Sequence, residues 1–88
     1  MPSYRYLVRG RVQGVGFRYF ARQRADHLGI AGFARNTPDG SVEVVAEGDV
    51  EALQAFEDAL RQGPSFADVT NVQRTEVPPR GAEGFYVR

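Results

Sequence analysis

The sequence predicts an α+β sandwich, in which two helices cover one face of a mainly antiparallel sheet. Three patterns support this prediction. Residues 4–12 and 41–47 alternate between apolar and polar side chains, as half-buried strands do. Residues 17–28, and the stretch between Asp49 and Gly63, carry apolar side chains at helical spacing instead. Between two short strands, residues 37–40 have the turn sequence Thr-Pro-Asp-Gly.

The first strand and the first helix are defined by their apolar residues. The strand covers roughly residues 4–12, with tyrosine and valine on one face and mainly arginine on the other. The helix begins near Phe17 and ends at Gly29, because glycine commonly terminates a helix. The positions expected to face the core are Tyr4, Tyr6, Val8, Val12, Phe17, Ala21, Ala25 and Leu28.

A β-hairpin follows the first helix. Residues 32–36 form its first strand and residues 41–47 its second, with Val42, Val44 and Ala46 directed inward. In the turn, Pro38 presets its own φ angle, and Gly40 accepts a positive φ that other residues avoid.

The second half of the chain adds a helix and two strands. Asp49 stands at the N-cap of the helix, and Gly63-Pro64 ends it. Residues 68–77 form a strand whose imperfect alternation allows a β-bulge, and residues 85–87 form a short last strand. The order β-α-β-β-α-β plus a terminal strand is that of the ferredoxin-like fold. The apolar stripe of this helix is Leu53, Phe56 and Leu60, widened by Ala52 and Ala59.

The composition limits the function. The 88 residues form one small domain, expected to span residues 1–88 and to be a monomer, and the formal net charge of zero argues against binding to nucleic acid or to a membrane. All eleven basic residues are arginine, so lysine chemistry is excluded. The absence of cysteine excludes disulfides and thiol nucleophiles. With no apolar signal core or transmembrane run, the expected location is cytoplasmic.

The loop at residues 13–18, Gln-Gly-Val-Gly-Phe-Arg, has the features of an anion site. Gly14 and Gly16 let successive N–H groups turn toward one point, at the start of a helix that no Ser, Thr, Asp or Asn caps. Arg18 adds a planar charged group suited to phosphate oxygens. The alternative is a tight glycine turn beside a surface arginine. Dinucleotide and Walker loops are excluded, because the third glycine and the Gly-Lys-Ser/Thr sequence are missing.

Asn36, at the end of the second strand, is the second candidate site residue. Its amide can donate and accept hydrogen bonds at once, which suits a group that holds a water molecule. The alternative is an asparagine that starts the turn by bonding to its own backbone.

Taken together, the two stretches resemble the two signatures of the acylphosphatase family. The resemblance covers nearly the whole chain in length, element order and motif spacing, and no motif position departs from it. The first stretch is Val8-x-Gly10-x-Val12-Gln13-Gly14-Val15-Gly16-Phe17-Arg18, and the second is Gly32-Phe33-Ala34-Arg35-Asn36-x-x-x-Gly40-x-Val42, with Gly48 further on.

The resemblance implies metal-independent hydrolysis of acyl phosphates to a carboxylate and inorganic phosphate, with no cofactor. It implies that Arg18 binds the phosphate and that Asn36 orients the attacking water. It also implies a sheet in which the first and third strands are central. The backbone N–H groups implied to complete the phosphate cradle belong to Gln13, Gly14, Val15, Gly16, Phe17 and Arg18.

Other titratable residues have simpler explanations. His27 belongs to the end of the first helix, where it complements the helix dipole, and Asp39 is a turn residue. The tyrosine and phenylalanine residues at strand and helix spacing are expected in the core, apart from Tyr19 beside the site. Solvated surface charge accounts for Arg9, Arg11 and Arg35.

Two alternative functions stay open at this point. One is a non-catalytic ferredoxin-like module that binds a small anion or RNA, although residues 41–45 lack the aromatic side chains of an RNA-binding strand. The other is an acylphosphatase-like domain of a larger carbamoyl-phosphate-handling maturation enzyme. A chain of 88 residues favours the freestanding protein.

Overall fold

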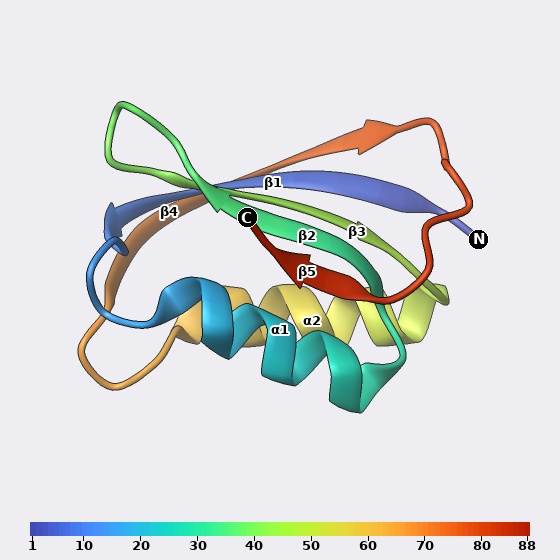
Figure 1. The fold of residues 1–88 in the computed structure, drawn as a ribbon, viewed down its shortest axis with the longest axis horizontal. Coiled ribbons are helices and arrows are strands. Elements are labelled where there is room, and N and C mark those ends of the chain that lie inside the picture. The colour runs from blue at the N-terminus through green and yellow to red at the C-terminus, as the bar shows by residue number, and fades with distance from the viewer.

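The computed structural model describes residues 1–88 and shows two layers, a five-stranded sheet and two helices packed on one of its faces (Figure 1). This is the predicted ferredoxin-like fold. The predicted bounds of the elements are confirmed to within one residue at most ends. The elements are β1 (Ser3–Arg11), α1 (Phe17–Leu28), β2 (Ala31–Asn36), β3 (Val42–Glu47), α2 (Val50–Gln62), β4 (Asp68–Val77) and β5 (Phe85–Val87).

The sheet has the strand order β4-β1-β3-β2-β5, which places the first and third strands inside it. All neighbours are antiparallel except β2 and β5, which run parallel. The register of β1 with β4 shifts between Arg9 and Gly10: Arg9 pairs with Asn71, and Gly10 pairs with Val69. One residue of β4, Thr70, is therefore left over, which is the bulge that the imperfect alternation of this strand allowed.

The core lies between the sheet and the helices. It contains sixteen buried apolar residues, and Tyr6, Phe17 and Phe56 are its largest side chains. Tyr6 and Phe56 meet edge to face with their ring centroids 6.2 Å apart. Every predicted inward position of β3 is buried, whereas Leu28 and Ala52 only pack against the edge of the core. The predicted sides of the strands and helices are therefore confirmed.

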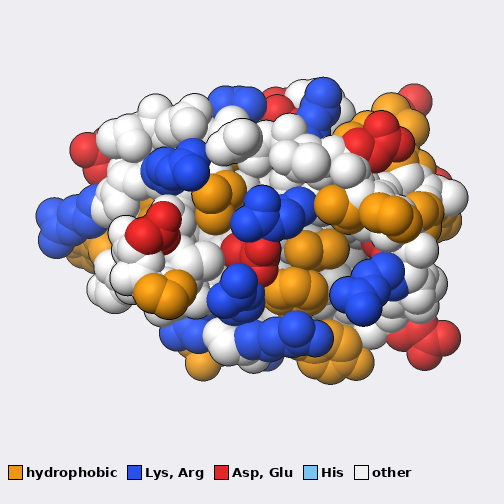
Figure 2. Space-filling view, turned by 90° about the horizontal axis from the view of Figure 1, so that it is seen from above, with side chains coloured by type: hydrophobic (Ala, Val, Ile, Leu, Met, Phe, Trp, Pro, Cys, Tyr) orange, Lys and Arg blue, Asp and Glu red, His pale blue; other side chains and the backbone are white.

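Arginine side chains gather over the face of the sheet that the helices leave open (Figure 2). Glu43 lies among them, only 8% exposed, and accepts hydrogen bonds of 2.5 Å from Arg5 Nε and Arg35 Nε. Burial disfavours the ionised form of Glu43, but the hydrogen bonds from both arginines outweigh it and lower the pKa of the carboxyl group. The centre of this face is therefore less exposed to solvent than the alternating pattern of β1 suggested.

Some aromatic residues that were expected in the core lie outside it, and Phe20 and Phe33 are only half-buried. Tyr86 in β5 is 61% exposed, because it pairs with Phe33 in register and shares the open face with it. Phe66 lies in the connection between α2 and β4, outside the elements for which burial was expected, and is 79% exposed. Tyr19 is exposed, as predicted.

The two helices differ in one detail from the sequence-based prediction. Asp49 occupies the N-cap position of α2, but its side chain makes no capping hydrogen bond. Gly29 and Gly63 follow the ends of α1 and α2, as predicted. Neither helix has the length and apolar character needed to span a membrane.

Candidate active site

The loop between β1 and α1 leaves a helix start without a cap. Gly14 and Gly16 have φ angles of 74° and 76°, which only glycine adopts readily, and Gly16 is the N-cap residue of α1. The next residue, Phe17, has its side chain buried in the core, and this packing holds the start of the helix in place. The first loop-to-helix bond runs from the Phe20 N–H to the Gly16 carbonyl oxygen at 3.0 Å. The backbone N–H groups of Phe17, Arg18 and Tyr19, which precede Phe20 in the helix, are therefore free to bind a ligand.

The electrostatics around the loop at residues 13–18 and the start of α1 favour a bound anion. No side chain caps α1, and its first turn has no acidic residue that would occupy the positive end of the helix dipole. A methyl group built on Gly14 or Gly16 would meet nothing within 4 Å, so the surface in front of the loop is open. These properties fit an oxyanion that approaches the backbone from solvent.

Arg18 lies in the first turn of α1 and is held by the far end of the chain. Its Nη1 donates a hydrogen bond of 2.5 Å to the main-chain oxygen of Arg88. Arg88 is fixed in turn, because its N–H donates to the Ala34 carbonyl oxygen at 2.9 Å and its guanidinium lies 4.1 Å from the centre of the Phe33 ring. The Arg18 side chain is thus oriented before any ligand arrives.

Asn36 lies at the end of β2, on the side of the sheet that faces the helices. It alternates with Gly32 and Ala34, which are both buried on that side. Its side chain makes no hydrogen bond to the turn, so it does not start the turn as the alternative required. The turn is held instead by Thr37 Oγ1, which donates to Asp39, and by the Ser41 N–H, which donates to Asp39 Oδ1 at 3.0 Å.

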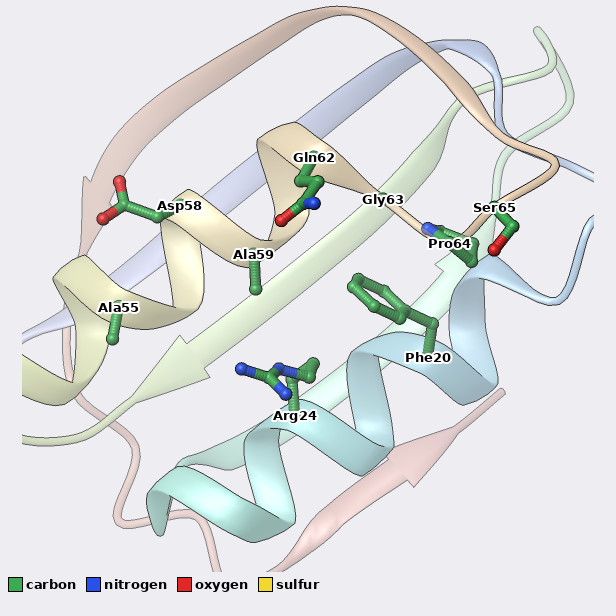
Figure 3. A pocket seen from close by; sticks show the side chains of 9 residues that line it. All are labelled: Phe20, Arg24, Ala55, Asp58, Ala59, Gln62, Gly63, Pro64 and Ser65. Carbon is green, nitrogen blue, oxygen red and sulfur yellow. The ribbon is translucent and has the colours of Figure 1, made fainter.

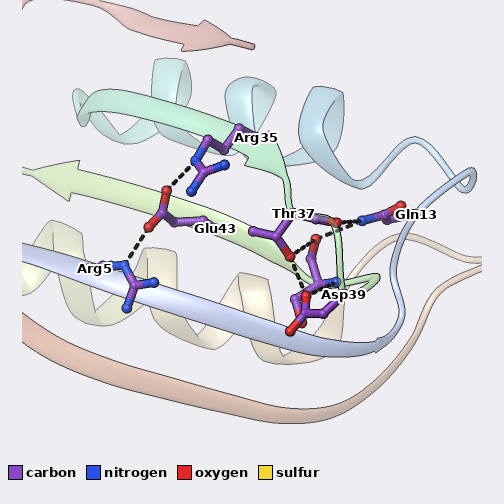
Figure 4. Close-up of polar contacts among 7 residues, drawn as sticks. Arg5, Gln13, Arg35, Thr37, Asp39 and Glu43 are labelled. Carbon is purple, nitrogen blue, oxygen red and sulfur yellow. Dashed lines mark hydrogen bonds and ion pairs between the residues drawn. The ribbon is translucent and has the colours of Figure 1, made fainter.

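Gln13 connects the loop to this turn (Figure 4). Its Nε2 donates to the carbonyl oxygens of Thr37, at 2.8 Å, and Ser41, at 2.9 Å. Residues 13–18 and the strand end at Asn36 are therefore joined by a direct side-chain bridge. The structure thus links the loop to the turn that follows Asn36, and it links Arg18 through Arg88 to Ala34, which lies on the same strand as Asn36.

The remaining titratable candidates are occupied elsewhere. The hydrogen bond from the Thr37 side chain, helped by that from the Ser41 N–H, lowers the pKa of the Asp39 carboxyl group. Asp39 is therefore an ionised turn residue. His27 is exposed in the last turn of α1, as predicted. No group of three or more histidine, cysteine, aspartate or glutamate side chains is arranged to hold a metal ion.

The largest hollow of the molecule is not at this corner. It is a groove of about 640 Å³ between α1 and α2, with Phe20 and Arg24 on one side and Asp58 and Gln62 on the other (Figure 3). Neither Arg18 nor Asn36 lines it. Because a phosphate group can be held by a few backbone N–H groups and one guanidinium at a surface, the shallow corner needs no deep cavity.

Two contributions to the corner were missed by the sequence analysis. One is the side chain of Gln13, for which only the backbone was considered, and the other is the main-chain oxygen of Arg88. Both hydrogen bonds end on main-chain oxygen atoms far along the chain. A main-chain oxygen carries no residue signature, so only the sheet order could have indicated these contacts.

Comparison with known proteins agrees with the fold and places the chain among the ferredoxin-like hydrolases. Residues 4–87 match the family model for acylphosphatase, and the chain belongs to the acylphosphatase family, hydrolases that act on acyl phosphates. It is similar to the acylphosphatase of Thermus thermophilus, with 52% identity over 87 residues, covering 99% of both chains. It is also similar to the crystal structure of acylphosphatase from Bacillus subtilis, with a TM-score of 0.97 and 45% identity, covering 100% of this chain and 99% of that one.

The same fold also occurs within a longer protein. The crystal structure of T. kodakarensis HypF is similar to this chain with a TM-score of 0.84 and 36% identity. The match covers 99% of this chain but 12% of that one.

Proposed function

We propose that this acylphosphatase works without a metal ion, that Arg18 and the backbone of residues 13–18 bind the phosphoryl group, and that Asn36 orients the attacking water. The observation that carries the proposal is the position of Asn36. Its amide has no partner within the protein, yet Gln13 ties its strand end to the uncapped loop. A free donor and acceptor beside an anion site is the arrangement that directs a water molecule at a bound phosphate.

The substrate itself explains why so few groups are needed. The leaving group of an acyl phosphate is a carboxylate, which departs without protonation by a general acid. Catalysis can therefore come mainly from positioning and from stabilisation of the charge on the phosphoryl oxygens. The start of α1 and the Arg18 guanidinium supply that positive charge, which is the contribution that a metal ion makes in other phosphoryl-transfer enzymes.

The proposed step is an in-line displacement at phosphorus. The oxygen of water forms the new P–O bond, and the bond between phosphorus and the acyl oxygen breaks. The electron pair of that bond leaves with the carboxylate, and the proton lost by water ends on inorganic phosphate or on solvent. Asn36 accepts a hydrogen bond from the water, and this bond keeps a lone pair of the water oxygen directed at phosphorus. Asn36 has no titratable group, so it orients the water and does not act as a general base.

The test is hydrolysis of benzoyl phosphate in the presence of EDTA. The proposal predicts full turnover that added magnesium does not raise, with inorganic phosphate as a competitive inhibitor. A folded protein that binds phosphate but releases no benzoate would be an anion-binding module instead. Activity that EDTA abolishes and magnesium restores would contradict the metal-independent step.

We also propose that the protein is a cytoplasmic monomer with one domain, residues 1–88, and that an acyl phosphate is its only partner.

A further inference from the structure

We propose that Gln13 is a positioning residue, whose side chain sets the distance between the bound phosphoryl group and the water held by Asn36. This inference rests on the proposed roles of Arg18 and Asn36 and goes beyond them. The role assigned to Gln13 by the loop motif concerns its backbone. The structure gives its side chain a separate set of contacts.

The two hydrogen bonds of the Gln13 side chain allow only one orientation of its amide group. Both partners of its amide, the carbonyl oxygens of Thr37 and Ser41, are acceptors that cannot donate. The NH₂ group must therefore face them and uses one hydrogen on each. The two distances, 2.8 and 2.9 Å, are those of well-formed hydrogen bonds. Figure 4 shows the side chain directed from the loop toward this turn.

The two acceptors are the ends of the turn that follows Asn36. The Thr37 carbonyl is one residue beyond Asn36, and the Ser41 carbonyl also accepts the Thr37 N–H at 2.9 Å. On its other side Asn36 pairs in register with Val42, which is fully buried. The strand end is thus fixed to the sheet through β3, and its only side-chain connection to the phosphate loop is Gln13.

Gln13 is itself well anchored in the loop. Val12 before it is 1% exposed, and Gly14 after it has its backbone fixed in the left-handed region. A movement of the turn away from the loop would therefore have to break both hydrogen bonds donated by the Gln13 side chain. Since a displacement of about 1 Å between reacting groups can lower a rate about 100-fold, a bridge of this kind acts on turnover rather than on binding.

Gln13→Met tests the inference, because methionine has nearly the same length and no donor. We expect kcat for benzoyl phosphate to fall by about 10- to 100-fold, with the inhibition constant of inorganic phosphate changed by less than about threefold. Gln23→Met, the same change at an exposed position of α1, is the matched control and should leave both constants unchanged. If Gln13→Met does not fold, Gln13→Asn keeps the amide but shortens its reach, and serves for the same comparison.

A double-mutant cycle separates positioning from general support of the fold. If Gln13 acts through Asn36, Gln13→Met should change kcat by less than about threefold once Asn36 is alanine. Additive losses would overturn the inference, as would an unchanged kcat or a phosphate inhibition constant that weakens in parallel with kcat. The single variants Arg18→Ala and Asn36→Ala test the proposed function separately. If they lose activity as proposed while Gln13→Met does not, only the positioning role fails.

Discussion

The Nη1 atom of Arg18 donates its hydrogen bond to the main-chain oxygen of Arg88, 70 residues further along the chain. This bond leaves the other N–H groups of the guanidinium free for a ligand while it fixes the plane in which they lie. The parallel pairing of β5 with β2 makes the contact possible, because it brings Arg88 beside Ala34 at the corner where α1 begins.

Replacement of Arg18 should show whether its fork geometry matters. We expect Arg18→Ala to lower kcat/KM for benzoyl phosphate by about 10²–10³-fold or more, because a fixed charge on the phosphoryl oxygens is lost. Arg18→Lys should recover little, since an ammonium group cannot make the paired contacts of a guanidinium. In thermal unfolding, inorganic phosphate should raise the Tm of the unmodified protein and not that of Arg18→Ala. Replacement of the exposed Arg22 by alanine is the control and should keep both properties.

Replacement of Asn36 should separate turnover from binding. Asn36→Ala removes the group that orients water but leaves Arg18 and the loop in place. We therefore expect a large fall in kcat with the inhibition constant of phosphate nearly unchanged, measured by steady-state kinetics. Loss of phosphate inhibition in this variant would assign Asn36 to the phosphate and not to the water.

The buried carboxylate on the open face should make stability depend on pH. The pKa of Glu43 is lowered below its ordinary value of 4.5, so its ion pairs with Arg5 and Arg35 stabilise the fold when it is ionised. This stabilisation is complete above the unfolded-state value and is lost as the pH falls through the lower folded-state pKa. Glu43→Gln should therefore reduce the free energy of unfolding by about 1–2 kcal/mol at neutral pH and by much less in acid.

Urea unfolding at neutral and acidic pH measures this difference. Glu76→Gln is a suitable control, because Glu76 is exposed in β4 and forms no ion pair. An equal loss of stability for Glu43→Gln at both pH values would mean that packing, and not charge, explains the burial of Glu43.

Most of the fold could be predicted because its signals are local. The glycine after α1, the Thr-Pro-Asp-Gly turn and the alternation of β3 each depend on neighbouring residues. The burial of Glu43 could not be predicted in this way, since an alternating strand gives the same pattern whether its polar face is open to water or covered by arginine side chains. The sheet order followed from the family resemblance and not from any one strand.

The candidate site was predictable in part for the same reason. The glycines and Arg18 follow one another in the sequence, so the uncapped helix start could be inferred from them alone. Asn36 is assigned through the second signature, and the structure adds that its side chain lies on the helix side without a partner in the turn. The hydrogen bonds of Gln13 and Arg18 to distant main-chain oxygen atoms could be found only from the tertiary structure.

The central claim, that water held by Asn36 attacks a phosphoryl group bound at Arg18, is tested most directly by isotope transfer. Benzoyl phosphate is hydrolysed by the enzyme in ¹⁸O-labelled water with EDTA present, and the two products are analysed by mass spectrometry. The proposed attack at phosphorus places the label in inorganic phosphate and leaves the benzoate unlabelled. Label in the benzoate would mean that water attacks the acyl carbon, and it would contradict the roles given to Arg18 and Asn36.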